Sequence, residues 1–269
     1  MTAFMPWWKV VIHDFFILEL EVEWDLDHPK DGKLIARLPH SVYALAVDPI
    51  RNLLFIGHNF EGIHVIDLNA GKEIWSLKLT DQAIFDIKVF GDEVYIGTGD
   101  GVLIVLDITT KTIRKHIKLG SKSIRVMSLA VLDLSDNFHP VANLTGHSNS
   151  VFALSYSPDE SILVSAGRDA RLKFWETDKY SLLESIVAHM YAINYLYFKE
   201  DGNLLVTCSM DKSIKVWDAT ERILLKVIDK ARNAGHGTSI NKVIWSSYHQ
   251  HVISVSDDRT ISIWQIDEN

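Results

Sequence analysis

The chain has 269 residues, of which 47% are hydrophobic and 23% are charged, and its formal net charge is −8. This composition predicts a globular protein large enough to bury a core, and the acidic balance disfavours nonspecific binding of nucleic acid or of an anionic membrane. The single cysteine, Cys208, excludes an intramolecular disulfide framework and a multi-cysteine zinc site, and it is typical of a reducing compartment.

The N-terminal stretch from Met1 to Leu20 is hydrophobic, but Lys9, His13 and Asp14 interrupt it. No small-residue cleavage site follows, so the stretch is a poor signal peptide. No run of the sequence reaches the ~18 apolar residues of a membrane span. We therefore expect a cytoplasmic protein that does not associate with membranes.

Two degenerate copies of a repeat follow this stretch. Residues 42–45 (Val-Tyr-Ala-Leu) resemble residues 151–154 (Val-Phe-Ala-Leu), and Ile66-Asp67 stands 24 residues after the start of its copy, as Trp175-Glu176 does in the later one. Residues 84–107 form a further copy that is shorter by two residues. The repeat therefore begins well before the region in which it is clearest.

The repeat is clearest near the C-terminus, where three segments align without gaps from a histidine to a tryptophan. In each segment an aspartate lies 22 residues after the histidine, and the tryptophan lies 6 residues after the aspartate. Two fixed offsets that recur three times predict a repeat architecture. The three sets are His147, Asp169 and Trp175; His189, Asp211 and Trp217; and His236, Asp258 and Trp264.

Repeat endings fall at seven positions, which favours seven structural repeats. The interval from Asp107 to Asp133 lacks about fifteen residues relative to its neighbours, so the fourth repeat is deficient. Two alternatives stay open: six repeats with an irregular insert, or a sequence that lacks a stretch near Arg125. The endings are Asp25, Asp67, Asp107, Asp133, Glu176, Asp218 and Gln265.

Inside each repeat the pattern predicts strands. Short runs such as residues 161–165, 172–175 and 181–186 are rich in Val, Ile, Leu and aromatic residues, and turn sequences such as Ser-Pro-Asp-Glu separate them. Four such runs fit in each repeat of about 42 residues. One four-stranded antiparallel unit cannot bury both of its faces, but a stack of copies can. The repeats therefore predict an all-β fold, a β-propeller.

At these residues the chain resembles the WD-repeat (Trp-Asp repeat) propeller family. The match rests on Gly146-His147 and Gly235-His236, on the turn aspartates, and on the endings Trp175-Glu176 and Trp217-Asp218. The resemblance implies a hydrogen-bonded tetrad with a structural role in each clear repeat. The expected tetrads are His147, Ser165, Asp169 and Trp175; His189, Thr207, Asp211 and Trp217; and His236, Ser254, Asp258 and Trp264.

The last repeat is expected to be one strand short, because the chain stops five residues after Trp264. In the resembled family the N-terminus commonly supplies that strand, and Trp8–Ile12 is the natural candidate here. Closure would remove an exposed sheet edge. We thus expect one domain over residues 1–269, a propeller of seven (alternatively six) four-stranded antiparallel blades closed by its N-terminal segment.

The resemblance also implies partner contacts on one rim of the propeller, at positions that vary between repeats. The first position lies five residues after the repeat histidine, and the second precedes the turn aspartate. Aromatic, Arg and Met side chains are enriched at interface cores, although Phe85 and Phe152 could equally pack between blades and Arg168 could be a solvated charge. The predicted rim residues are Tyr43, Phe85, Arg125, Phe152, Asn194 and Asn241 at the first position, and Arg168, Met210 and Asp257 at the second.

No motif indicates catalysis, a cofactor or a metal site. Gly97–Gly101 looks like a phosphate loop but precedes a predicted strand, and His249 and His251 have no evident third ligand. We predict a non-enzymatic scaffold, most simply a monomer, that binds a protein or peptide. The alternatives are a propeller enzyme with a central-channel site, for which Asp86 is the candidate carboxylate, and an RNA-associated propeller using the Lys230–Arg232 loop, which the acidic net charge disfavours.

Overall fold

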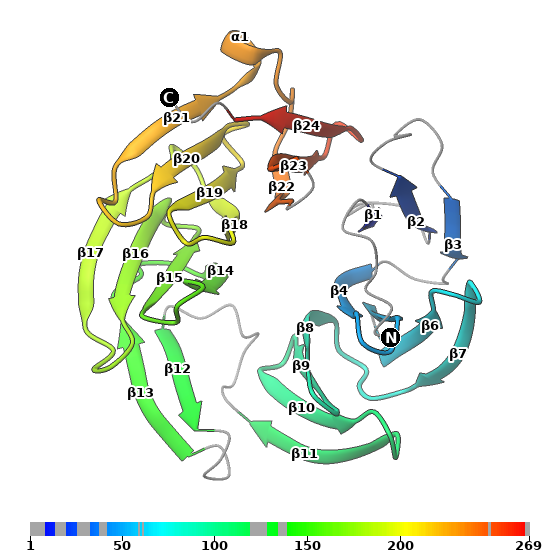
Figure 1. The fold of residues 1–269 in the computed structure, drawn as a ribbon. Coiled ribbons are helices and arrows are strands. Elements are labelled where there is room, and N and C mark those ends of the chain that lie inside the picture. Colours follow the sequence, from blue (N-terminus) through cyan, green and yellow to red (C-terminus); the bar gives the residue numbers. More distant parts are fainter. Residues whose placement is uncertain are drawn as a thin grey trace. The chain divides into compact units, whose positions relative to one another are not determined.

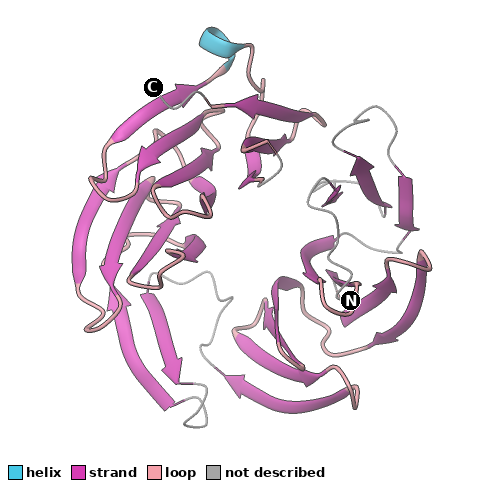
Figure 2. Cartoon of the chain, in the orientation of Figure 1, coloured by secondary structure: helices cyan, strands magenta, loops and turns pink. Residues whose placement is uncertain are grey.

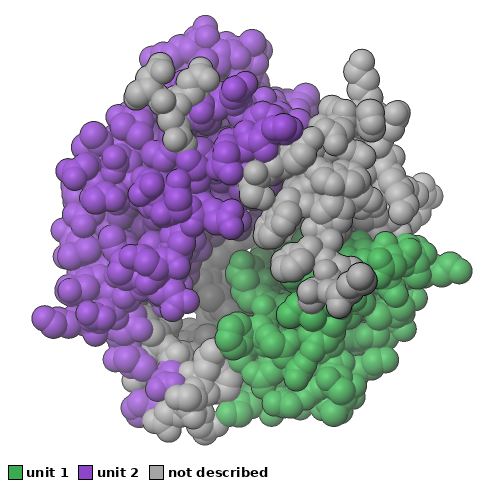
Figure 3. Space-filling model, in the orientation of Figure 1, with its two compact units in different colours: residues 1–124 green, residues 125–269 purple. Residues whose placement is uncertain are grey.

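The structure is a computed structural model in which strands dominate and the described residues contain one short helix (Figure 1, Figure 2). It describes residues 9–13, 20–25, 33–37, 42–58, 60, 62–118, 128–133, 139–246 and 249–266. The chain divides into two compact units, residues 1–124 and residues 125–269 (Figure 3). Within the described ranges, no helix has the length and apolar character needed to cross a membrane.

Unit 1 contains three antiparallel sheets, each built from strands that follow one another in the chain. The first sheet has three described strands, and the other two have four each. The strands are β1 (Lys9–His13), β2 (Leu20–Asp25) and β3 (Lys33–Arg37); β4 (Val42–Asp48), β5 (Leu53–His58), β6 (Gly62–Asp67) and β7 (Lys72–Leu77); and β8 (Ile84–Phe90), β9 (Glu93–Thr98), β10 (Val102–Asp107) and β11 (Thr112–Lys118).

Unit 2 follows the same plan, with described sheets of two, four, four and three strands. The strands are β12 (Ser128–Asp133) and β13 (His139–Thr145); β14 (Val151–Tyr156), β15 (Ile162–Gly167), β16 (Arg171–Glu176) and β17 (Leu182–Val187); β18 (Ile193–Phe198), β19 (Leu204–Ser209), β20 (Ile214–Asp218) and β21 (Leu224–Ile228); and β22 (Ile240–Trp245), β23 (His251–Ser256) and β24 (Ile261–Gln265). Helix α1 (Lys230–Asn233) lies between β21 and β22.

The middle strands of each four-stranded sheet are buried, whereas the last strand is largely exposed. All six residues of β5 are buried, and so are five of the six in β15. In β11 and β17, by contrast, no residue is fully buried. A strand buried on both faces needs cover from both sides, so each sheet must have neighbours stacked against it.

Neighbouring sheets inside each unit supply that cover. In unit 1, β4 and β5 contact β8, and Phe55, Ile87 and Ile96 share one core cluster. In unit 2, β14 and β15 contact β18, and β18 and β19 contact β22. Phe174 and Trp217 belong to the core cluster between the β14–β17 and β18–β21 sheets. Antiparallel four-stranded sheets stacked face to face are propeller blades. The predicted all-β class and the four-stranded antiparallel blade are confirmed.

The predicted number of seven blades, and its alternative of six, is not supported. Among the described residues four sheets have four strands. The β22–β24 sheet has three strands, but like those four sheets it has a bulge at the second residue of its first strand. Together these five sheets are the blades of the structure. The sheets β1–β3 and β12–β13 have only three and two described strands. The number of repeat endings overestimated the number of blades. Each ending marks a single strand, whereas a complete blade needs enough residues for four strands.

The closing strand expected at Trp8–Ile12 is placed differently where the structure describes it. Strand β1 pairs antiparallel with β2, so that Lys9 faces Asp25 and His13 faces Glu21. Among the described residues, the β22–β24 sheet keeps three strands. Trp8 lies outside the described residues, and ring closure by the N-terminal segment stays a prediction.

Gly167, at the end of β15, approaches the backbone of β14 too closely for a side chain. A Cβ at this position would lie 2.1 Å from the Ser150 carbonyl oxygen and 2.8 Å from the Val151 Cα. Because backbone atoms cannot rotate away as side chains can, we expect Gly167→Ala to lower the free energy of unfolding by about 1–3 kcal/mol. Urea unfolding measures this loss.

Gly237→Ala is the matched control for this substitution, since the nearest atom to its Cβ position is the flexible Lys230 Nζ at 3.5 Å. This variant should unfold close to wild type. Equal stability of the two variants would contradict the close approach at Gly167.

Candidate interaction surface

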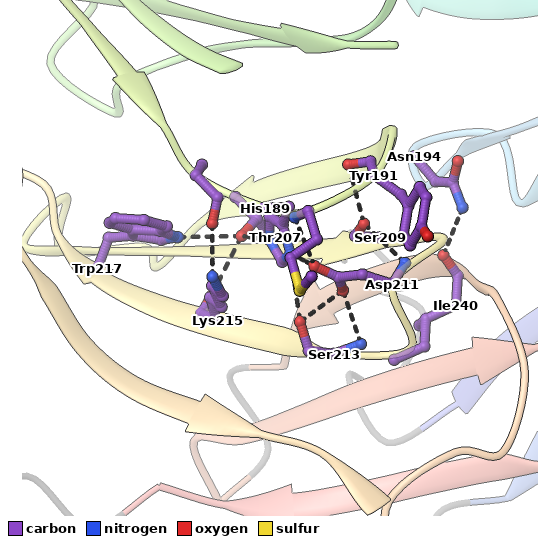
Figure 4. Close-up of polar contacts among 12 residues, drawn as sticks. His189, Tyr191, Asn194, Thr207, Ser209, Asp211, Ser213, Lys215, Trp217 and Ile240 are labelled. Carbon is purple, nitrogen blue, oxygen red and sulfur yellow. Dashed lines mark hydrogen bonds and ion pairs between the residues drawn. The ribbon is translucent and has the colours of Figure 1, made fainter. Parts of the chain in front are cut away.

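A buried chain of four side chains lies in the β18–β21 blade (Figure 4). His189, in the connection between β17 and β18, has its Nε2 2.8 Å from the Thr207 Oγ1 and its Nδ1 2.9 Å from the Asp211 Oδ2. The Trp217 indole N–H donates to the same Thr207 hydroxyl at 3.0 Å. His189 and Trp217 are each 3% exposed and Thr207 is 0% exposed, so these groups depend on one another for hydrogen bonds.

The two ends of the tetrad set the direction of the hydrogen bonds, because the indole can only donate and the ionised Asp211 carboxylate can only accept. The Thr207 hydroxyl accepts from Trp217 and gives its own hydrogen to the Nε2 of His189. The Nδ1–H of a neutral His189 ring then donates to the Asp211 carboxylate. This arrangement satisfies every member of the tetrad with His189 uncharged.

The structure brings the other two predicted tetrads together in the same way. In both, the histidine lies between a buried serine hydroxyl and the turn aspartate, and the indole donates to that serine. The histidine–serine, histidine–aspartate and indole–serine distances are 2.7, 2.9 and 2.8 Å for His147, Ser165, Asp169 and Trp175, and 2.8, 3.2 and 2.9 Å for His236, Ser254, Asp258 and Trp264.

Burial acts on the pKa of the histidine in two of the tetrads, those of His189 and His147. It lowers the pKa of His189, and the hydrogen bond and charge of Asp211 oppose this effect only in part. Burial also lowers the pKa of His147 against the same kind of opposition. In Asp211 burial acts to raise the pKa, but hydrogen bonds and attraction from His189, with hydrogen bonds from Ser213 and the Met190 N–H, outweigh it and lower the pKa. Neutral pH therefore leaves the imidazole uncharged and the carboxylate ionised.

Each tetrad aspartate also fixes the loop that follows the histidine, and it does so through a backbone N–H. The loop residue next to the histidine differs in each repeat, yet its amide always donates to the aspartate. The donors are Ser148 to Asp169 at 3.1 Å, Met190 to Asp211 at 3.0 Å, and Gly237 to Asp258 at 3.0 Å.

A second set of backbone hydrogen bonds joins the turn that contains each tetrad aspartate to the start of the first strand of the same blade. The amides of Arg168, Met210 and Asp257 donate to the carbonyl oxygens of Ser150, Ala192 and Ser239 at 2.8, 3.0 and 3.0 Å. These loops therefore lie at one end of each blade. We call the segments of unit 2 at this end the blade-end surface: residues 146–150, 167–170, 188–192, 209–213, 229–239 and 256–260.

The first predicted rim position coincides with a β-bulge in all five blades. The ladder pairs Val151 with Gly167 and Ala153 with Ala166, so that Phe152 is left unpaired. A bulge redirects a side chain and interrupts the ladder locally. The bulged residues are Tyr43, Phe85, Phe152, Asn194 and Asn241.

The bulged residues differ in what their side chains do. Phe85 and Phe152 are half-buried. The Asn194 amide donates to the Ser239 Oγ at 3.0 Å and to the Ile240 carbonyl oxygen at 2.8 Å, so it ties two blades together. The side chain of Tyr43 and the whole of Arg125 lie outside the described residues.

At the second position, all three predicted residues in unit 2 are exposed. Arg168 and Asp257 are exposed, and Met210 is 51% exposed. The Asn241 amide donates to the Asp257 carboxylate at 2.6 Å, so two predicted rim residues bind each other. Arg168 and Met210 are left facing solvent.

Two exposed residues of the blade-end surface were missed by the sequence reasoning. Met190 is 83% exposed and Tyr191 is 63% exposed, in the loop that follows His189. A signal was present, because the equivalent residues in the first clear repeat are Ser148 and Asn149. Large apolar residues in a loop where another copy has small polar ones indicate a function other than folding.

The connection between β21 and β22, which contains the Lys230–Arg232 loop, includes helix α1. The Asp229 carboxylate caps the helix by accepting from the Arg232 N–H at 2.8 Å, and it also forms an ion pair with the Arg232 guanidinium. Lys230 lies exposed in the same turn. The loop is therefore ordered by its own residues, with Lys230 as its available cation.

The candidate carboxylate for an enzyme, Asp86, is 67% exposed at its side chain, accepts from the Ile87 N–H at 3.0 Å and lies 3.9 Å from the Lys88 Nζ. Among the residues that the structure describes, no three His, Cys, Asp or Glu side chains gather as a metal site would require.

Three stretches of the chain match the WD40 family model, described as WD domain, G-beta repeat: residues 138–176, 180–218 and 229–265. They contain the three tetrads and the first three strands of each blade that holds one: β14–β16, β18–β20 and β22–β24. These stretches are therefore WD40 repeats, and the resemblance to the WD-repeat propeller family is confirmed.

The chain is also similar to curated proteins named WD repeat and SOCS box-containing protein 1. It is 34% identical to the one from Takifugu rubripes over 103 residues, which are 36% of this chain and 23% of that protein. It is 28% identical to the one from Homo sapiens over 130 residues, 48% of this chain and 25% of that protein.

A third relative is the U3 small nucleolar RNA-associated protein 21 of Saccharomyces cerevisiae, 26% identical over 179 residues, which are 61% of this chain and 18% of that protein. The chain thus spans a quarter or less of the length of these relatives.

Replacing Thr207 by Val should destabilise unit 2, because it removes the hydroxyl that both Trp217 and His189 need. Each buried polar group left without a partner costs about 1–3 kcal/mol, so we expect a loss of roughly 2–5 kcal/mol in urea unfolding. Thr207→Ser is the control, since the other tetrads use serine. A loss as large for Ser as for Val would contradict the role of the hydroxyl.

Acid should destabilise the protein through the tetrad histidines His147 and His189. Because folding lowers the pKa of His189, the unfolded chain binds a proton first, and stability is lost as the pH falls below the ordinary histidine value of about 6.5 towards the folded pKa. Asp211 acts with the same sign at lower pH. We expect His189→Gln to lessen the fall in Tm between about pH 7.5 and pH 5.

Circular dichroism at the two pH values measures this change, and His249→Gln, at an exposed histidine in a turn, is the control. If both variants showed the same fall in Tm as wild type, protonation of His189 would not limit acid stability.

Proposed function

We propose that this protein is a non-enzymatic scaffold that binds a protein or peptide partner through the blade-end surface and the neighbouring rim residues. The observation that carries the proposal is a group of large apolar side chains, Met190, Tyr191 and Met210, which stand 83%, 63% and 51% exposed on firmly held loops. Exposed apolar residues gathered at one place mark an interaction site.

The rigidity of these loops supports the proposal. Met190 is anchored by its amide to Asp211, and Met210 by its amide to the Ala192 carbonyl oxygen. The Ser209 hydroxyl donates to the Tyr191 carbonyl oxygen at 3.2 Å (Figure 4). A partner therefore meets a surface whose main chain is already ordered, so association costs less conformational entropy.

The relatives fit a binding role. By name, the WD repeat and SOCS box-containing proteins combine WD repeats with another segment, which suits repeats that serve as an interaction module. We propose further that this chain acts as a cytoplasmic monomer with one domain closed by its N-terminal segment.

An RNA-associated propeller is the second candidate, and the name of the yeast relative favours it. The net charge of −8 and the ion pair between Arg232 and Asp229 in the proposed RNA-binding loop count against it. A protein partner accounts better for the exposed methionines, which suit adaptable apolar contacts.

The double variant Met190→Ala with Tyr191→Ala tests the proposal. Proteins that wild type retains from its native lysate should be recovered at about a tenth of the wild-type amount, because large side chains at the centre of an interface carry much of the binding energy. Quantitative mass spectrometry of the retained proteins gives the measurement.

The control is Ile223→Ala with Leu224→Ala, which removes apolar side chains that are 54% and 43% exposed at the outer strand of the same blade. This control should retain the same proteins as wild type. A loss of partners in the control, with none in the Met190 and Tyr191 variant, would place the binding surface elsewhere.

A further inference from the structure

The carboxylates of the blade-end surface are engaged in contacts within the protein. Each tetrad aspartate accepts from a histidine and from a loop N–H, Asp229 caps α1 and pairs with Arg232, and Asp257 accepts from Asn241. The negative charge at this end is thus used to hold the loops. A partner meets carboxylates that already have donors.

Within the described residues, four of the five cations of the same surface have no such contact, whereas the fifth, Arg232, pairs with Asp229. Arg168, Lys212, Lys230 and Arg259 are all exposed, and in the described part of the chain none of their side chains takes part in an ion pair or a hydrogen bond. Three of them are sequence neighbours of tetrad aspartates: Arg168 precedes Asp169, while Lys212 and Arg259 follow Asp211 and Asp258. The tetrads therefore hold these cations in place indirectly, through the turns.

The cations come from the blade that carries the exposed apolar group and from the blades on either side of it. Met190, Tyr191 and Met210 belong to the β18–β21 blade, which also carries Lys212. Arg168 comes from the blade on one side, where the Ala170 carbonyl oxygen accepts from the Ala188 and His189 amides at 2.9 and 3.2 Å. Arg259 comes from the blade on the other side, whose first strand contacts β18. An apolar centre within a charged rim is the usual anatomy of a protein interface.

From this arrangement we infer that the partner segment is an acidic peptide with an apolar anchor: its aromatic or aliphatic side chain packs on Met190, Tyr191 and Met210, and its carboxylates face Arg168, Lys212 and Arg259. The inference rests on the proposed function and names the chemistry of its partner. Because the chain as a whole has a net charge of −8, unpaired cations at one blade end would steer an acidic segment to this place.

The surface favours a peptide over RNA. Single-stranded RNA is held by successive aromatic platforms along a basic groove, whereas the exposed apolar group here has one aromatic ring and two methionines. Methionine side chains adapt to aliphatic and aromatic side chains of varied shape. Binding of RNA to these cations would overturn the inference.

The test begins with random 12-residue peptides displayed on phage and selected against the full chain. We expect the selected peptides to be rich in Asp and Glu and to share an aromatic or aliphatic residue. Fluorescence anisotropy then compares one selected peptide on wild type and on the triple variant Arg168→Glu, Lys212→Glu and Arg259→Glu. Binding to this variant should be about tenfold or more weaker, and raised salt should weaken wild-type binding.

The triple variant Lys72→Glu, Lys111→Glu and Lys179→Glu is the matched control, because it makes the same charge change at exposed lysines outside the blade-end surface. It should bind the peptide within about twofold of wild type, since only long-range, screened effects remain. Equal weakening in both triple variants would overturn the inference.

Other outcomes separate the inference from the proposed function. Selected peptides that are neutral or basic, yet fail to bind the Met190→Ala, Tyr191→Ala variant, would overturn the acidic class and leave the proposed function standing. Peptides that bind this variant as well as wild type, or a selection that enriches nothing, would overturn both. A 12-nucleotide single-stranded oligouridine that binds more tightly than the peptide, and is lost in the first triple variant, would assign the cations to RNA.

Discussion

A buried indole N–H that can only donate organises each clear repeat. Because the Asp211 carboxylate can only accept, the neutral His189 ring donates to it through Nδ1 and accepts at Nε2 from the Thr207 hydroxyl, which itself accepts from Trp217. The tetrad thus runs in one direction from the blade core to the loops at its end. The last member of the tetrad is an ionised carboxylate, which has lone pairs left to accept hydrogen bonds from the backbone N–H groups of the loop. Loop order at the blade end follows from a group buried between strands.

Unit 1 reaches order by other means. In the β8–β11 blade the buried Thr98 hydroxyl donates to Asp100 at 2.6 Å, but Leu106 stands where a clear repeat has tryptophan. Ion pairs of Arg114 with Glu93 and Asp107 brace the opposite end of that blade. Packing of Phe55, Ile87 and their neighbours supplies the core. The two units therefore share a strand plan while differing in how much they rely on polar contacts.

The sequence was sufficient to predict residues whose type is limited by a hydrogen-bonding role that recurs in each repeat. The spacing of His189, Asp211 and Trp217 predicted residues that the structure brings together, because a tetrad tolerates few residue types. It was insufficient for the number of blades, because strand pairing over residues 107–133 depends on neighbours that the spacing does not encode. It also missed Met190 and Tyr191, because their signal is a difference from Ser148 and Asn149 in the equivalent loop and not a residue type that recurs.

The sequence also could not show which surface residues form hydrogen bonds with each other, because each position was considered alone. Asn241 and Asp257 each fitted the pattern of a contact residue, yet the structure joins them to each other. Asn194 fitted too, and it links two blades. Whether a polar side chain faces a partner or a neighbour depends on what the adjacent blade offers, and that is known only once the blades are stacked.

The loop after each tetrad histidine is held by its main-chain amide, whether the residue is Ser148, Met190 or Gly237. Every residue except proline has a backbone N–H, so this hydrogen bond does not depend on the side chain of the loop residue. The exposed side chain of this loop residue can therefore change in evolution without loss of the hydrogen bond that holds the loop. A single substitution there changes the exposed side chain while the aspartate keeps its hydrogen bond to the backbone.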